Sequence, residues 1–138
     1  RGVLEAFLDD ALERYPIDPE RLVILGFSQG GVMAYDLALG RPDKYAALVA
    51  LSSWLPDVVT QTLSEDPGRG SLSTLVIHGK QDPMIGIEKA HESRAKLQEV
   101  GIEASFGEYD MGHEIQPNAL RDIIGWLLNG PFAGAGIA

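Results

Sequence analysis

The feature that most constrains this chain is a glycine-flanked serine that follows a short apolar run. The run Leu22 to Leu25 is apolar throughout, and Gly26-Phe27-Ser28-Gln29-Gly30 comes directly after it. A helical pattern begins at about Gln29, so the order is strand, Gly-x-Ser-x-Gly and helix. This order is typical of a nucleophile elbow, a strained turn that holds a serine hydroxyl above the carboxyl edge of a sheet. So tight a turn requires small residues beside the serine, which predicts that Gly26 and Gly30 cannot carry side chains; a plain Gly-rich turn is the alternative.

Apolar runs and helical patterns alternate along the rest of the chain. Strands separated by helices predict an α/β fold with a parallel sheet, flanking helices and right-handed crossovers. A length of 138 residues predicts a single domain over residues 1–138. The continuous run 22–25 is typical of a strand covered on both faces. The predicted strands are 22–25, 45–51, 73–77 and 104–109, the predicted helices are 3–12, 29–39, 87–100 and 120–128, and 52–70 is a predicted polar loop.

Charge and cysteine content exclude several kinds of site. The net charge of −9 argues against nucleic acid and anionic membrane surfaces as partners, since both need clustered Lys and Arg. The chain has no cysteine, which excludes disulfides and thiolate metal sites and fits a reducing compartment, so the predicted location is cytoplasmic. No apolar run reaches membrane-spanning length. No set of His, Glu and Asp has metal-ligand spacing, so no metal site is predicted.

Two further reactive residues follow later predicted strands. Asp82 comes after the strand 73–77, and His113 comes after the strand 104–109. Because the carboxyl ends of parallel strands meet at one edge of a sheet, both are expected near Ser28. The order Ser, Asp, His along the chain is also that of the α/β-hydrolases.

These three residue types form a familiar chemical unit. A serine hydroxyl is a poor nucleophile until a base takes its proton, and a neutral histidine can be that base. A buried carboxylate can fix the tautomer of the histidine. The pattern therefore predicts Ser28 as nucleophile, His113 as general base and Asp82 as orienting acid, with the backbone N–H of Gln29 facing the oxyanion.

Several of these residues have a competing structural interpretation. Asp82 precedes a proline and could be a turn residue. Asp110 is a competing acid, but its closeness in sequence to His113 favours a loop cap. His78 ends a buried strand and is predicted to be structural, whereas His91 is predicted to be a solvated residue on a helix.

Apolar residues near the predicted site suggest an acyl pocket. Apolar side chains more often belong to a core than to a binding site, so the core interpretation stays open beside the pocket interpretation. The candidate lining residues are Trp54, Leu55, Met84 and Ile85.

Four segments together resemble the phospholipase/carboxylesterase family, which includes the acyl-protein thioesterases. They stand in family order, and the resemblance covers the chain up to about Leu128. It implies an α/β-hydrolase without a cofactor that cleaves carboxylic esters or thioesters of small to medium acyl groups through an acyl-enzyme. It implies the same roles for Ser28, Asp82 and His113. The four segments are Gly26-Phe27-Ser28-Gln29-Gly30-Gly31, Leu51-Ser52-Ser53-Trp54-Leu55-Pro56, His78-Gly79-Lys80-Gln81-Asp82-Pro83 and Met111-Gly112-His113-Glu114-Ile115.

The sequence departs from that family in one respect. Family members carry strands before the equivalent of the first helix here, and a loop after one of those strands supplies a first oxyanion donor. The expectation is therefore an α/β-hydrolase that lacks the family's N-terminal strands and keeps only the Gln29 N–H of the donor pair. The strand 22–25 would then have an open edge, which predicts a homo-oligomer or a complementing N-terminal segment.

Two other functions stay open. The chain could be a non-catalytic fragment that acts only in assembly, or a serine peptidase of the same fold. Turnover of a chromogenic acyl ester separates the enzyme from the fragment.

Overall fold

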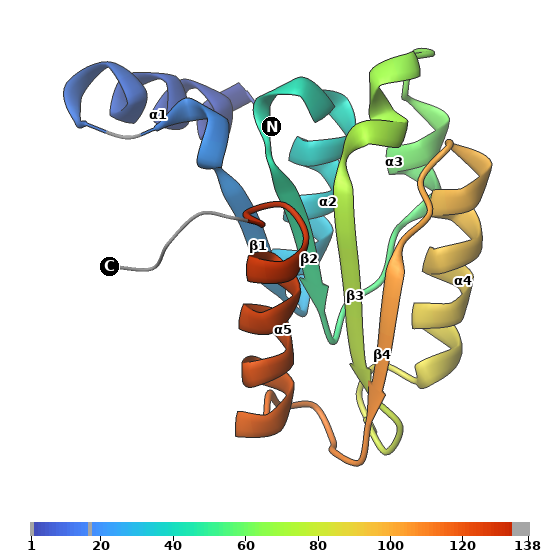
Figure 1. Ribbon diagram of the computed structural model, residues 1–138. Coiled ribbons are helices and arrows are strands. Elements are labelled where there is room, and N and C mark those ends of the chain that lie inside the picture. Colours follow the sequence, from blue (N-terminus) through green and yellow to red (C-terminus); the bar gives the residue numbers. More distant parts are fainter. Residues whose placement is uncertain (1, 17, 134–138) are drawn as a thin grey trace.

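The computed structural model, which describes residues 2–16 and 18–133, has a four-stranded parallel sheet at its centre (Figure 1). The spatial order β1-β2-β3-β4 is the same as the order along the chain. Residues 1, 17 and 134–138, which the predicted single domain also includes, lie outside the described residues. The strands are β1 (Val23–Phe27), β2 (Ala47–Leu51), β3 (Ser73–Gly79) and β4 (Ser105–Tyr109). The helices are α1 (Gly2–Arg14), α2 (Gln29–Gly40), α3 (Asp57–Gln61), α4 (Ile87–Glu99) and α5 (Pro117–Asn129).

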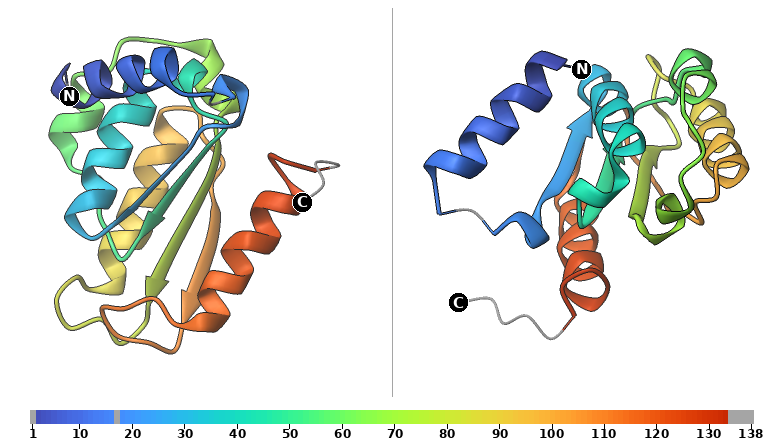
Figure 2. Two further views of the ribbon diagram at one scale, coloured as in Figure 1. Left: turned by 90° about the vertical axis from the view of Figure 1, so that its left-hand side faces the viewer. Right: turned by 90° about the horizontal axis from the view of Figure 1, so that it is seen from above.

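Helices cover both faces of the sheet and create two cores. On one face, Ala34 and Leu37 of α2 and Ala90 and Leu97 of α4 pack with Leu48 of β2 in a large apolar cluster. On the other face, α5 packs alone against the sheet in a smaller cluster (Figure 2). All five residues of β2 are buried, because this strand has neighbours on both edges and helices on both faces. That environment explains its continuous apolar sequence.

The first strand differs from its prediction. Both faces of the strand 22–25 were expected to be covered, but Leu25 is 49% exposed, and Phe27 at the end of the same strand is 40% exposed. The expected open edge is present, because β1 is an edge strand of the described sheet. Among the described residues, no strand pairs with its outer edge. The N–H of Ser28 and the C=O of Leu22 bond to the segments on the β2 side. Because alternate residues of a strand turn their N–H and C=O to opposite sides, those of Val23 and Leu25 point to the free edge.

Helix α1 is only loosely attached to this framework. None of its residues is buried. Leu4 and Leu8 pack against the edge of the larger core, while Phe7 is 67% exposed. The large apolar side chain of Phe7 therefore faces solvent.

The predicted α/β fold with flanking helices is confirmed. The predicted loop 52–70 is more ordered than expected, because it contains α3 and a short 3₁₀ helix over Pro67–Ser71. None of the described helices is long and apolar enough to cross a membrane.

Candidate active site

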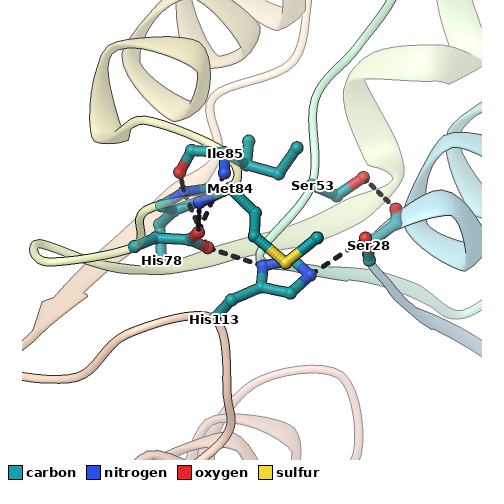
Figure 3. Close-up of polar contacts among 7 residues, drawn as sticks. Ser28, Ser53, His78, Met84, Ile85 and His113 are labelled. Atoms are coloured by element: carbon teal, nitrogen blue, oxygen red, sulfur yellow. Dashed lines mark hydrogen bonds and ion pairs between the residues drawn. The ribbon is translucent and has the colours of Figure 1, made fainter.

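Ser28 occupies a sharp turn between β1 and α2. Its backbone φ of 56° and ψ of −120° lie in a region that non-glycine residues rarely adopt. The turn is held from β2, because the N–H of Ser28 donates to the carbonyl of Leu51 at 2.8 Å. The hydroxyl of Ser53 donates to the carbonyl of Ser28 at 2.7 Å (Figure 3). The segment at the end of β2 thus holds both the backbone N–H and the backbone C=O of the strained serine.

The glycines that permit this turn are not the pair that the motif suggested. A Cβ on Gly26 would lie 2.1 Å from the carbonyl oxygen of Gly30, so position 26 cannot carry a side chain. A Cβ on Gly31 would lie 2.4 Å from the Cβ of Ser53. A Cβ on Gly30 would meet no atom within 4 Å. The prediction for Gly30 was therefore wrong, because it considered the turn alone and not the packing of helix α2 on Ser53.

The structure brings Ser28, His113 and Asp82 together at the carboxyl edge of the sheet. The Nε2 atom of His113 lies 3.1 Å from Oγ of Ser28, and its Nδ1 atom lies 2.7 Å from Oδ2 of Asp82. The side chain of Asp82 is fully buried and that of His113 is 14% exposed. A carboxylate only accepts hydrogen bonds, so Nδ1 carries a proton. In the neutral ring Nε2 is then free to accept the proton of the serine hydroxyl.

Hydrogen bonds keep the buried carboxylate of Asp82 ionised. Its Oδ1 accepts from the backbone N–H groups of Met84 at 2.9 Å and Ile85 at 2.8 Å. Burial alone would raise the pKa of Asp82, but the bonds from Ile85, His113 and Met84 outweigh it and hold the pKa below its ordinary value. A negative charge therefore faces Nδ1 of His113.

Sequence reasoning missed one residue that contacts the group formed by Ser28, His113 and Asp82. The ring of Phe27 lies against that of His113, with ring centroids 4.8 Å apart and planes tilted by 43°. Its position directly before Ser28 was the only signal available, and that signal says nothing of the distant histidine. The backbone N–H of Gln29 stands at the first position of α2, where an α-helix leaves its amide groups without an intrahelical partner.

Three of the four predicted pocket residues share a hollow. Trp54, Met84 and Ile85 line a cavity of about 280 Å³ beside the turn that contains Asp82. The rest of its lining is Gly86 and two residues at the start of α4, Glu88 and Lys89. Leu55 lies apart from them. Its side chain is 1% exposed and belongs to the larger core, so the structure does not place it in this hollow.

The remaining candidates have other partners. The carboxylate of Asp110 pairs with Lys80 at 3.0 Å on the surface. His91 is half-exposed and pairs with Glu108 at 2.8 Å. His78 is fully buried, and its Nε2 contacts the carbonyl of Ile85 at 2.7 Å. Among residues 2–16 and 18–133, no group of three or more His, Asp or Glu residues could hold a metal ion.

Comparison with known proteins places the chain in a family. The model of the family described as Phospholipase/Carboxylesterase matches residues 2–128. Acyl-protein thioesterase 1 of Gibberella zeae is 32% identical over 116 residues, which is 80% of this chain and 48% of that protein. Lysophospholipase-like protein 1 of Mus musculus is 30% identical over 129 residues, which is 91% of this chain and 53% of that protein.

A crystal structure of a similar protein has the same fold over most of this chain. SOBER1 of Arabidopsis thaliana superimposes with a TM-score of 0.80 and 26% identity, over 93% of this chain and 61% of that chain. The chain spans about half the length of the curated relatives it matches.

Proposed function

The chain belongs to the phospholipase/carboxylesterase family, and we propose that it is a serine hydrolase that cleaves carboxylic esters or thioesters of small to medium acyl groups. The observation that carries the proposal is the continuous hydrogen-bonded series from Oγ of Ser28 through His113 to Asp82. The relatives support it, since they are named as acyl-protein thioesterases and carboxylesterases.

Acylation begins at Ser28. Its Oγ forms a bond to the carbonyl carbon of the substrate while Nε2 of His113 takes the hydroxyl proton. The imidazolium that results is stabilised by the ionised carboxylate of Asp82. The carbonyl oxygen becomes an oxyanion, which the backbone N–H of Gln29 faces at the start of α2.

Release and deacylation use the same groups in reverse. The tetrahedral intermediate collapses, the bond to the alcohol or thiol breaks, and Nε2–H of His113 gives its proton to that leaving group. A water then attacks the acyl-enzyme, with Nε2 taking one water proton and returning it to Oγ of Ser28 as the acid departs. No cofactor takes part in either half.

Acyl length is limited by the hollow beside the site. Trp54, Met84 and Ile85 form its apolar wall, and a volume of about 280 Å³ suits a small or medium acyl chain. The neighbouring segment 52–70 carries Asp57 and Glu65, whose charges do not suit a cover that docks on lipid.

The experiment that tests this function compares two serine variants. Wild-type chain should hydrolyse a p-nitrophenyl acyl ester and react covalently with a fluorophosphonate probe, and Ser28→Ala should do neither. Ser64→Ala is the matched control, because Ser64 is an exposed loop residue far along the chain from the elbow, and it should retain both. Ester turnover that survives in Ser28→Ala contradicts the mechanism, and faster cleavage of a matched peptide amide identifies a peptidase instead.

We also propose that the free edge of β1 pairs with another strand, from a second copy or from a complementing segment. The support is the outward N–H and C=O groups of Val23 and Leu25 and the exposure of Leu25 and Phe27. An open apolar edge is a template for strand pairing.

A further inference from the structure

We propose that His78 is a positioning residue for the proposed active site, a neutral imidazole that holds the 82–85 turn in the shape that aims the Asp82 carboxylate at His113. The inference rests on the proposed function for its kinetic consequence, but its structural content can be measured without turnover.

The bond from His78 to the turn defines its tautomer. Nε2 of His78 lies 2.7 Å from the carbonyl oxygen of Ile85, and a carbonyl oxygen can only accept. Nε2 must therefore carry a hydrogen. The Nδ1 atom is buried and has no hydrogen-bond partner among the described residues. A proton on Nδ1 would create a buried N–H without an acceptor, so the surroundings suit the neutral Nε2–H form.

The residue that His78 holds is the one that binds Asp82. Both backbone polar groups of Ile85 are hydrogen-bonded: its N–H donates to Oδ1 of Asp82 at 2.8 Å, and its C=O accepts from Nε2 of His78 (Figure 3). With Oδ1 occupied by two backbone N–H groups, Oδ2 is the oxygen left for His113. Loss of the His78 bond frees the Ile85 carbonyl, and the turn can rotate away from this arrangement.

His78 also contributes directly at the carboxylate. Its Nε2 lies 3.6 Å from Oδ2 of Asp82, and both side chains are fully buried. That distance is too long for a hydrogen bond, but it brings the positive end of the N–H dipole near the oxygen that faces His113. Two histidines thus approach the same oxygen, one as its hydrogen-bond donor and one as a fixed neutral neighbour.

The test uses two amide substitutions that differ by one methylene group. In His78→Gln, the side-chain amide reaches the former position of Nε2 and can donate to the Ile85 carbonyl; in His78→Asn it is too short. His91→Gln and His91→Asn are the matched controls at an exposed histidine. Two experiments are made. Steady-state kinetics gives kcat and KM for a p-nitrophenyl ester over a range of pH, and proton NMR follows the far-downfield resonance of a histidine N–H bonded to a carboxylate.

The expected result separates the two variants. His78→Asn should lose the downfield resonance, lower kcat by about 100-fold with little change in KM, and move the acid limb of the kcat profile to lower pH. His78→Gln should keep the resonance and stay within about tenfold of the wild-type kcat. A residue that only fills space would affect stability equally in both and leave the pH profile in place.

Every other outcome also decides for or against the proposal. Equal loss in the two variants, or full retention in both, overturns it. Should His78→Asn not fold by circular dichroism, a folded His78→Gln without the resonance overturns it, and one that keeps the resonance and turnover supports it. If the wild type shows the resonance but no ester turnover, the proposed function fails while the resonance in the two variants still decides the role of His78.

Discussion

Nε2 of His113 lies 3.1 Å from the hydroxyl oxygen of Ser28, although 85 positions separate the two residues in the chain. Ser28 follows β1 and His113 follows β4, and strands β2 and β3 lie between these two strands in the sheet. The loop after β4 must therefore cross the ends of β2 and β3 to reach Ser28. It does so by packing closely on the loop after β3, where the N–H of Gln81 donates to the carbonyl of Met111 at 3.1 Å. A Cβ on Gly79 would lie 2.3 Å from that carbonyl, so this approach needs glycine.

In catalysis, Ser28, His113 and Asp82 should act as one unit. We expect Ser28→Ala and His113→Ala each to lower kcat for an acyl ester by at least about 10⁴-fold, and Asp82→Asn to cause a severe but smaller loss. The double variant Ser28→Ala/His113→Ala should be hardly worse than either single one, because each already removes nucleophilic attack. Steady-state kinetics on a p-nitrophenyl ester measures this, and additive losses would contradict a shared proton path.

Activity should fall on the acid side of neutral pH. A proton on Nε2 of His113 removes the base, so turnover should be lost as that nitrogen becomes protonated. Asp82 does not add to this limb, because its pKa is held below the ordinary 3.8. The check is kcat/KM from about pH 8 to about pH 5. Flat activity across that range would exclude a histidine base.

The same lowered pKa predicts how stability depends on pH. A carboxylate whose folded-state pKa is depressed stabilises the fold at every pH above its unfolded value of about 3.8, and that contribution is lost as pH falls through the lower folded value. Wild type should therefore lose more stability in acid than Asp82→Asn does. Urea unfolding at a neutral and an acidic pH gives the comparison; identical losses in the two proteins would argue against the hydrogen-bonded carboxylate.

The elbow glycines should differ sharply in tolerance. Gly26→Ala and Gly31→Ala should each lower the free energy of unfolding by about 3 kcal/mol or more, because the new methyl group meets backbone at position 30 or the side chain of Ser53. Gly30→Ala is the matched control; it should be neutral or raise that free energy by up to about 1 kcal/mol, since helix favours alanine. Urea unfolding measures all three, and a severe loss at position 30 would contradict this packing.

Short and medium acyl esters should react faster than long-chain triglycerides. Trp54→Ala opens the wall of the hollow. We expect it to raise the KM for a medium-chain ester by about tenfold and to change the KM for the corresponding acetate ester little. Val58→Ala, an exposed position outside the hollow, is the control. Strong activation at an oil–water interface would contradict the chosen substrate class.

The open edge of β1 should cause self-association of the 138-residue chain. Light scattering coupled to size exclusion should give a mass that rises with concentration. Leu25→Pro removes an outward N–H without touching the bonds to β2, and should reduce association. A wild-type monomer at every concentration would show that this edge is not used.

The fold could be predicted because its strands and helices carry strong apolar periodicity. Predicted and observed elements agree to within a few residues at β2, α4 and α5. Helix α3 was missed because five residues are too few to give a periodic stripe. The exposure of Leu25 could not be predicted from the run itself, since an apolar residue looks the same on a covered and on an open face of a strand.

The candidate site was predictable where topology alone determines position. Parallel strands send the loops of Ser28, Asp82 and His113 to one edge, so their meeting followed from their order in the chain. The contact of Phe27 with His113, the core position of Leu55 and the pairing of Gly31 with Ser53 depend on side-chain packing between distant segments. No local pattern carries that information, and the catalytic roles themselves stay predictions until the variants are measured.

The strand order has a consequence for synthesis on the ribosome. Because the sheet follows the chain from β1 to β4, segments emerge in the order in which they pack, and the strained turn at Ser28 can be held in place once Leu51 and Ser53 have emerged. Its hydroxyl has no base at that stage, since His113 is translated last of the three and docks only with the loop after β4. The proposed nucleophile would therefore lack its base while the first three strands are being made, and the proposed activity requires the complete sheet.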